Sequence, residues 1–155
     1  MAKNFKRKKE EDELIRRFEE YQKNKASHFF ELDNFDYIIS YYQDQGKYLQ
    51  ALSAVNIAFE QYPFSIELLV IKAQVLSNLE RFDEALELLD TAESYQPCDG
   101  EIFQMKGSIM SLLGQYEIAI DTYKKALSFA DEKDEIFYSM GLAYQTMEQY
   151  DEAIE

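Results

Sequence analysis

Apolar residues recur along most of this chain with the spacing of an α-helix. One such stripe consists of Phe35, Ile38, Ile39 and Tyr42. Positions i, i+3, i+4 and i+7 lie on the same side of a helix, so the stripe predicts one buried helix face. After an interruption at Gln45-Gly46, a second stripe of the same kind runs from Tyr48 to Phe59. The pattern predicts two helices joined by a short turn.

This pair of stripes returns every 34 residues. One position of the repeat is always small, and it is filled by Ala51, Ala85, Ala119 and Ala153. Another position is always aromatic, and it is filled by Tyr48, Phe82, Tyr116 and Tyr150. A fixed period of roughly 20–50 residues is typical of helical-repeat proteins. We therefore expect two-helix repeats over residues 32–65, 66–99 and 100–133, with a partial repeat over residues 134–155.

Residues with special packing or backbone roles keep the same register. The position where the two helices of a repeat would cross is filled by Ile39, Ala73, Gly107 and Gly141. Small residues at such a crossing let two backbones approach closely. Gly46 and Gly114 suit the left-handed backbone that ends a helix, and Ser65 and Asp99 suit the N-cap of the next first helix. These signals support the predicted helix boundaries.

The repeat resembles the tetratricopeptide repeat. The resemblance rests on residues at several positions at once: Gly107, Ala119, Ala126, Phe103, Tyr116, Tyr123, Pro63 and Pro97. The runs Phe82-Asp83-Glu84-Ala85 and Tyr150-Asp151-Glu152-Ala153 are similar to the start of the family's second helix, and only Ile39 departs from the small residue expected at the crossing. The resemblance covers residues 32–155. It implies an all-α superhelix, a solenoid of antiparallel helix pairs whose first helices line a concave groove for an extended or helical peptide.

By that resemblance, three positions of each first helix would face the groove. They are Asp36, Ser40, Gln43, Val70, Gln74, Ser77, Gln104, Ser108, Ser111, Tyr138, Leu142 and Gln145. Family members that bind the acidic C-terminal tails of heat-shock chaperones use Lys, Asn and Arg at such positions, whereas the first repeat here offers Asp36 and Ser40. We expect a neutral or basic protein segment with a few apolar anchors as the partner. The alternative is an inert, solvated inner face.

Charge is distributed unevenly along the chain. Residues 1–25 carry nine Lys and Arg against six Asp and Glu, whereas residues 26–155 carry seven against twenty-four. The acidic residues 26–155 repel phosphate backbones and anionic lipid head groups. We therefore expect neither nucleic acid nor a membrane as a partner. No apolar run approaches the ~20 residues of a membrane span, and a single cysteine allows no internal disulfide. We expect a cytoplasmic protein.

The first 31 residues form a segment outside the repeats. Residues 1–9 are expected to be a basic, disordered tail, in which Lys6-Arg7-Lys8-Lys9 is also compatible with a nuclear import signal. Residues 10–25 place Leu14, Ile15 and Phe18 on one face of an amphipathic helix. We expect this helix, with a linker up to residue 31, to cap the first repeat. Docking to a partner is the alternative.

No residue pattern indicates catalysis or cofactor binding. His28 is the only histidine and Cys98 the only cysteine, so neither the common zinc ligand sets nor a Cys-His nucleophile pair with an orienting histidine can be assembled. The glycines form no phosphate-binding or dinucleotide-binding loop, and no acid cluster has the spacing of a calcium loop. We expect no catalytic, cofactor-binding or metal-binding residues, and a non-enzymatic protein-protein interaction module.

The fourth repeat contains only residues 134–155 and stops within its expected second helix. Repeat proteins normally cover their last apolar face with a polar terminal helix. Here the apolar residues left half covered would be Phe137, Met140, Tyr144 and Ile154. We therefore expect this chain to be the N-terminal part of a longer repeat protein, and we expect the isolated fragment to self-associate through its open end. Two alternatives are the targeting or regulatory arm of an enzyme or regulator with a further domain beyond residue 155, and a small acidic chaperone of the same repeat type.

Overall fold

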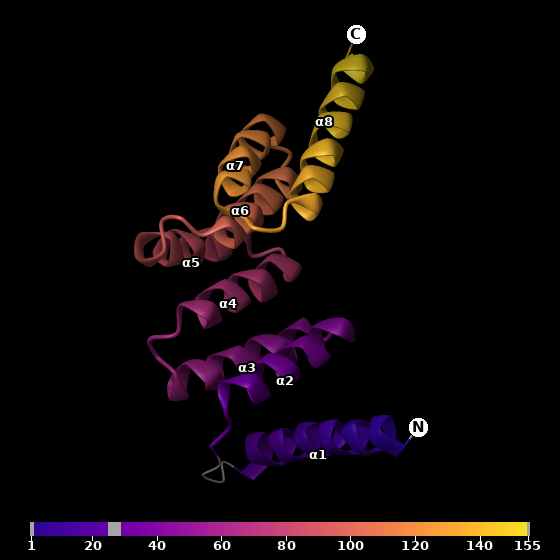
Figure 1. The fold of residues 1–155 in the computed structure, drawn as a ribbon, viewed down its shortest axis with the longest axis vertical. Helices are drawn as coiled ribbons and strands as arrows, with labels where there is room; N and C mark the ends of the chain where they lie inside the picture. Colours follow the sequence, from indigo (N-terminus) through magenta and orange to yellow (C-terminus); the bar gives the residue numbers. More distant parts are fainter. Residues whose placement is uncertain (1, 25–28, 155) are drawn as a thin grey trace. The chain divides into compact units, whose positions relative to one another are not determined.

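The described part of the chain is entirely helical. The structure is a computed structural model that describes residues 2–24 and 29–154, with side chains described for residues 9–24 and 29–148; His28 lies outside these ranges. The helices of the described residues are α1 (Ala2–Asn24), α2 (Leu32–Asp44), α3 (Tyr48–Gln61), α4 (Ile66–Asn78), α5 (Phe82–Tyr95), α6 (Gly100–Leu112), α7 (Tyr116–Phe129) and α8 (Asp134–Ile154) (Figure 1). The all-α prediction is confirmed.

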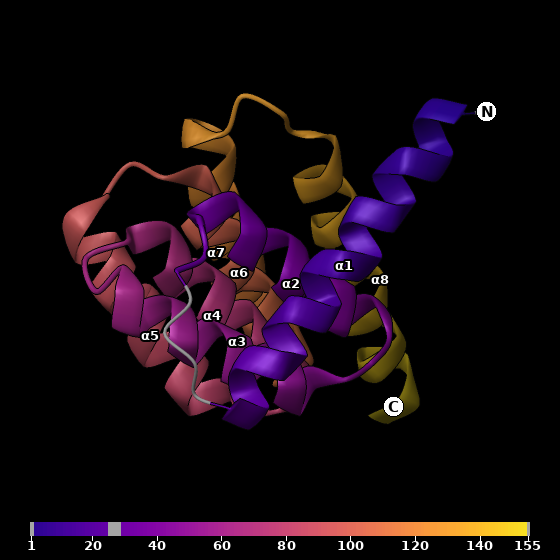
Figure 2. The same ribbon diagram turned by 90° about the horizontal axis from the view of Figure 1, so that it is seen from below.

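The helices start at the predicted interval. The first helices of successive repeats, α2, α4, α6 and α8, begin 34 residues apart, and so do α3, α5 and α7. The chain divides into two compact units, an N-terminal unit of residues 1–68 and a C-terminal unit of residues 69–155. In the N-terminal unit α2 packs along α3. In the C-terminal unit α6 and α7 lie side by side in both views (Figures 1 and 2), with α5 packed on α6 and α8 on α7.

In the N-terminal unit, α1 contacts α2. Phe18 is fully buried and its ring meets those of Phe30 and Phe35 edge to face, at 5.6 Å and 6.2 Å between centroids. The prediction of a disordered tail over residues 1–9 is wrong, because α1 already begins at Ala2. Residues 2–24 contain neither Gly nor Pro and are rich in Lys, Arg and Glu, which favour helix. This composition favours helix on both sides of residue 10, so the helix does not start there.

Helix ends follow the predicted caps. Gly46 and Gly114 have the positive φ values expected of them, 67° and 74°. The equivalent residue between α4 and α5 is Glu80, which adopts the same left-handed backbone with φ 59°, a conformation that costs a side-chain-bearing residue roughly 1–2 kcal/mol. The Ser65 hydroxyl accepts a hydrogen bond from the Leu68 N–H, and the Asp99 carboxylate accepts one from the Glu101 N–H at 2.9 Å.

The fourth repeat differs from the prediction. α8 is one continuous helix from Asp134 to Ile154, with no turn before Tyr150. The residue 34 positions after Gly114 is Glu148, which favours continuing a helix over a left-handed turn. Glu80 precedes the fourteen residues of α5 and adopts the left-handed turn, whereas at Glu148 the helix continues. Along α8, Phe137 and Tyr144 are largely exposed.

Helix pairs are held together by a small residue facing a larger one. A Cβ atom added to Gly107 would lie 2.7 Å from the ring of Tyr123, well inside van der Waals contact. The same two repeat positions hold buried Ala73 and Leu89 in the preceding repeat, and buried Ile39 and Val55 in the first. From the first repeat to the third, the first-helix residue is smaller and the second-helix residue larger. This relation is the one that close packing at the α6–α7 crossing requires.

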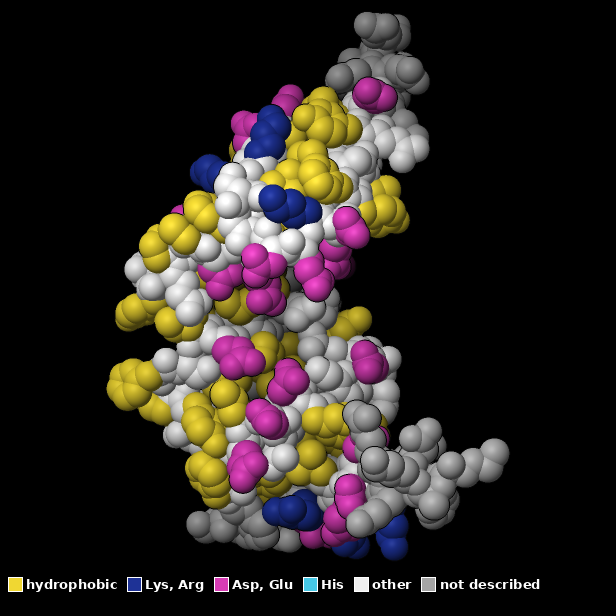
Figure 3. All heavy atoms as spheres, viewed as in Figure 1, with side chains coloured by type: hydrophobic (Ala, Val, Ile, Leu, Met, Phe, Trp, Pro, Cys, Tyr) yellow, Lys and Arg dark blue, Asp and Glu magenta, His cyan; other side chains and the backbone are white. Residues whose placement is uncertain are grey.

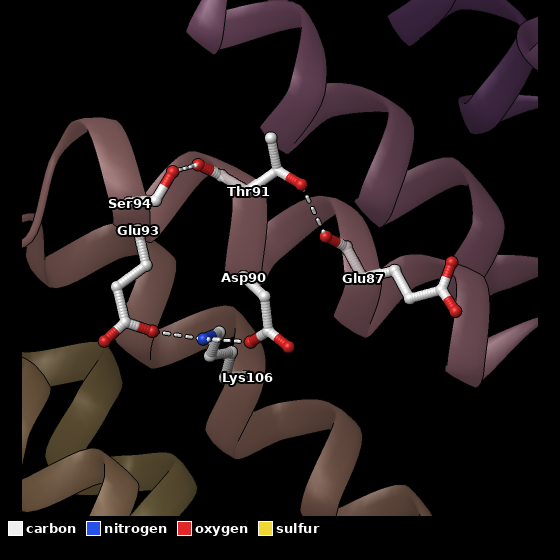
Figure 4. A network of polar contacts seen from close by, with 6 residues as sticks. All are labelled: Glu87, Asp90, Thr91, Glu93, Ser94 and Lys106. Carbon is white, nitrogen blue, oxygen red and sulfur yellow. Dashed lines mark hydrogen bonds and ion pairs between the residues drawn. The ribbon is translucent and has the colours of Figure 1, made fainter.

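A half-buried lysine also joins α5 to α6. The Lys106 ammonium lies 2.6 Å from a carboxylate oxygen of Asp90 and is also hydrogen-bonded to Glu93, while its side chain is only 12% exposed (Figure 4). Burial by itself lowers the pKa of Lys106, but the hydrogen bonds from the ammonium to the two carboxylates raise it by more, so its pKa stands above the ordinary value. Lys106 is therefore protonated and contributes a positive charge to the α5–α6 contact.

The crossing of α6 and α7 yields a first prediction. Gly107→Ala is expected to lower the free energy of unfolding by about 1–3 kcal/mol, because the added methyl overlaps the Tyr123 ring. Adding Tyr123→Leu, which reproduces the preceding repeat, should recover part of that loss. As a control, Gly141→Ala in α8, which meets no atom within 4 Å, should stabilise by about 0.5–1 kcal/mol. Urea unfolding followed by circular dichroism measures all three; equal effects at both glycines would contradict this packing account.

The lysine contact yields a second prediction. Lys106→Met should lower the free energy of unfolding by about 1–2 kcal/mol, because charge-assisted hydrogen bonds to two carboxylates are lost. Lys125→Met, at an exposed site on α7, should change it by less than about 0.5 kcal/mol. Since the folded-state pKa of Lys106 is raised above 10.5, the difference between wild type and Lys106→Met should stay constant below that pH and shrink only above it. Urea titrations at a series of pH values test this, and a neutral Lys106→Met would refute it.

Candidate binding groove

A large open groove lies on the C-terminal unit. It encloses about 1330 Å³ between the end of α4, one face of α6, the loop after α7 and the start of α8. Its floor and walls include Gln74, Ser77, Asn78, Gln104, Met105, Ser108, Leu112, Phe129 and Ala130. Its rim carries the charged residues Asp99, Glu101, Asp131, Glu132, Lys133, Asp134 and Glu135. We call this cavity with these residues the acidic groove.

The acidic groove has six carboxylates and one lysine. Figure 3 shows acidic side chains gathered on this part of the surface, around the loop between α7 and α8. Four of the six lie at the N-cap or in the first turn of α6 or α8, where a negative charge also offsets the positive end of the helix. Asp131 and Glu132 belong to no helix and are exposed. Helix stability therefore does not account for these two.

A smaller cavity adjoins the acidic groove, and we call it the side pocket. It has a volume of about 340 Å³ and shares Ser108 and Leu112 with the groove. Its remaining lining is Ser111, Tyr116, Tyr123, Ser139, Leu142, Ala143 and Thr146. These side chains combine apolar walls with several hydroxyl groups, the mixture typical of pockets that orient a bound group. The two cavities together form one continuous surface over α6.

The hydroxyl groups in the side pocket differ in their hydrogen bonding. The Tyr123 hydroxyl donates to Ser108 Oγ at 3.2 Å, and Ser108 Oγ donates to the Gln104 carbonyl at 3.1 Å. In contrast, Ser111 Oγ is buried and has no hydrogen-bond partner among the residues whose side chains are described. A buried hydroxyl without a partner is unfavourable by about 1–3 kcal/mol. A bound group that reached Ser111 Oγ would remove this cost.

The predicted groove residues separate into distinct locations. Gln74, Ser77, Gln104 and Ser108 line the acidic groove, and Ser108, Ser111 and Leu142 line the side pocket. Tyr138, 69% exposed, and Gln145 lie on α8 and line neither of these two cavities. Asp36, Ser40 and Gln43 lie on α2 of the N-terminal unit, where Asp36 and Ser40 are exposed and Gln43 is half-buried. The structure therefore brings together six of the twelve.

Val70 was expected to face the groove, but it is only 8% exposed. The cause is the composition of α4, in which Leu68, Val70, Ala73 and Val75 are all buried. Such a helix is buried on more than one side. Val70 is a packing residue and offers little surface to a ligand.

Several groove residues were missed by sequence analysis. The groove that the family resemblance implies includes only positions of the first helices, so it leaves out the carboxylates of the loop after α7. The signal was present as the run Asp131-Glu132-Lys133-Asp134-Glu135, four acids in five positions. The apolar residues Met105, Leu112 and Phe129 carry no comparable signal, since their repeat positions are not otherwise distinctive.

The described residues carry no candidate metal site and no candidate membrane-spanning helix. Among those residues, no group of three or more His, Cys, Asp and Glu side chains is placed to hold a metal ion. Likewise, none of the helices described has both the length and the apolar character needed to cross a membrane. Cys98 is a free, exposed thiol.

Solved structures with the same fold include several tetratricopeptide-repeat (TPR) domains. MamA aligns with a TM-score of 0.69 at 19% identity, covering 99% of this chain and 88% of that one. The Sgt2 TPR domain from Aspergillus fumigatus gives 0.67 at 16% identity, covering 79% and 83%. The first TPR of Spaghetti (RPAP3), bound to the HSP90 peptide SRMEEVD, gives 0.61 at 19% identity, covering 70% and 86%. At such low identities these likenesses establish the fold alone.

A family model places the chain more narrowly. No curated protein matches the sequence. The model described as "Psidin, N-terminal TPR repeats region" matches residues 39–154, most of the chain. The TPR fold is typically a non-enzymatic scaffold for protein interactions, and the family match supports a protein-interaction module. The chain belongs to the family of Psidin N-terminal TPR repeats.

Proposed function

We propose that the C-terminal unit binds a basic protein segment carrying one apolar anchor residue. The observation that carries this proposal is the charge of the acidic groove, which sets six carboxylates against one lysine around a cavity of about 1330 Å³. A concentration of one charge sign in a concave surface attracts and orients a segment of opposite charge. The cations of the segment would pair with Asp131, Glu132 and their neighbours.

The anchor residue belongs in the side pocket. The exposed apolar side chain of Leu142 and the shared Leu112 offer apolar surface there. A cavity of about 340 Å³ has room for one large side chain. Because the linings of the two cavities share Ser108 and Leu112, the cavities are neighbours and one segment can reach both. Preformed helices hold this surface in place, so little ordering entropy is lost by the protein on binding.

The charge also separates this module from a structural relative. The first TPR of Spaghetti was solved with SRMEEVD, a peptide with three acidic residues and one arginine. Here a peptide of that charge would meet the six carboxylates of the acidic groove. Like charges at close range oppose binding. We therefore expect SRMEEVD not to bind this chain.

A charge test uses two synthetic peptides, GKGFKGKG and its acidic counterpart GEGFEGEG, labelled for fluorescence polarisation. The basic peptide should bind and the acidic peptide and SRMEEVD should not. Gln74→Arg with Gln104→Arg, both in the acidic groove, should raise the Kd of the basic peptide at least tenfold, about 1.4 kcal/mol. Gln96→Arg with Gln115→Arg, two exposed sites outside the groove, adds the same charge and should raise it less than threefold.

The outcomes of the charge test are distinct. Equal effects of the two arginine pairs would mean that only net charge matters and would remove the groove from the account. Binding of the acidic peptide as tightly as the basic one would refute the proposal. Circular dichroism of each variant checks that the helices are intact.

An anchor test compares GKGFKGKG with GKGAKGKG. Loss of the phenylalanine should weaken binding to the wild-type chain about tenfold, since apolar burial of a side chain is worth about 1.5–3 kcal/mol when complete. In Leu142→Ala this difference should fall below threefold, because a wall of the side pocket is gone. Leu113→Ala is the matched control: Leu113 is 41% exposed, close to the 45% of Leu142, but lines neither cavity. If both leucine variants behave alike, the side pocket is not the anchor site.

A further inference from the structure

The chain itself contains a segment with the chemistry that the acidic groove favours. Residues 2–9 read AKNFKRKK, with five Lys and Arg, no acidic residue and a single aromatic side chain, Phe5. The acidic residues of the N-terminal region begin only at Glu10. Basic charge and one apolar anchor therefore occur together within eight residues.

This segment is poorly placed where α1 begins. α1 starts at Ala2 and has no acidic residue in its first turn. The positive end of a helix is stabilised by acidic groups and destabilised by cations, each by roughly 0.3–1 kcal/mol. Lys3, in the first turn, thus raises the free energy of this helix end. Ile15 and Phe18, further along the helix, are buried. An acidic surface would therefore stabilise the start of α1.

We infer that the basic segment of residues 2–9 binds in the acidic groove of a second copy of the chain. The inference rests on the proposed function and names the partner of that same site. Charge complementarity carries it: five cations meet six carboxylates and one lysine. Phe5 is the anchor that enters the side pocket. The next residues, Glu10 to Glu13, are acidic and mark where the bound segment ends.

The contact has a definite consequence for assembly. The segment belongs to the N-terminal unit and the groove to the C-terminal unit, so one copy uses different surfaces toward its two neighbours. Such a heterologous contact adds copies head to tail unless the arrangement closes into a ring. The association is therefore concentration-dependent and weakens as salt screens the charges. It also differs from self-association through an apolar C-terminal end, which salt would not weaken.

The binding test uses the labelled peptide MAKNFKRKK and a chain lacking residues 2–9, whose groove is free of competing segments. The peptide should bind, and its Kd should rise at least tenfold in 500 mM NaCl relative to 50 mM NaCl. MAKNAKRKK, without the aromatic anchor, should bind about tenfold more weakly. Gln74→Arg with Gln104→Arg should weaken the peptide at least tenfold, and Gln96→Arg with Gln115→Arg less than threefold.

The assembly test uses the full chain in sedimentation velocity from 5 to 200 µM. The average mass should rise with concentration above the 18.3 kDa of one chain. Lys6→Glu with Lys8→Glu should abolish the rise, whereas Lys47→Glu with Lys125→Glu, at exposed sites outside both the segment and the groove, should leave it. These two pairs change the net charge equally.

The outcomes separate this inference from the proposed function. If GKGFKGKG binds but MAKNFKRKK does not, the self-recognition is overturned and the proposed function stands. If neither basic peptide binds, both fail. If MAKNFKRKK binds but the full chain remains a monomer at 200 µM, association between copies is overturned. A mass increase that is unaffected by Lys6→Glu with Lys8→Glu overturns it as well.

Discussion

The close crossing of α6 and α7 at Gly107 is the contact on which the candidate site depends. Because Gly107 has no side chain, the Tyr123 ring can lie against the α6 backbone. From there the Tyr123 hydroxyl reaches Ser108, and Ser108 lines both the acidic groove and the side pocket. Gly107 thus determines the core packing, and the adjacent Ser108 forms part of the surface of the candidate site. A change in the depth of this crossing would move the wall that the two cavities share.

Electrostatics has two roles in the acidic groove. Asp99 caps α6 through hydrogen bonds to backbone N–H groups, and Glu101, Asp134 and Glu135 lie in first turns where they stabilise helix ends. The same carboxylates give the groove its negative charge. Removing one of them would therefore alter folding and recognition together. Adding arginine at neutral positions such as Gln74 and Gln104 changes the charge of the groove while leaving these caps intact.

The fold was predictable because its signals are local and repeated, and the candidate site was predictable only in part. Gly46, Gly114 and Asp99 each fix a helix boundary through their own backbone or side-chain chemistry. Two predictions failed, the turn before Tyr150 and the exposure of Val70 in the groove, because each depends on more than one residue. Glu80 and Glu148 are the same residue type at the same repeat position, yet the chain turns at Glu80 and stays helical at Glu148, and whether Val70 faces a groove depends on burial around the whole of α4. Neither is encoded at one repeat position.

The matched sizes of Ile39 with Val55, Ala73 with Leu89, and Gly107 with Tyr123 bear on how such an array can diversify. Duplicating or deleting a whole repeat carries both partners of a pair and keeps the crossing filled. A recombination event that joins the first helix of one repeat to the second helix of another separates them. Joining the Gly107 helix to a Val55-type partner leaves a void, and joining the Ile39 helix to a Tyr123-type partner produces a clash. Viable breakpoints in the gene therefore fall between repeats rather than within them.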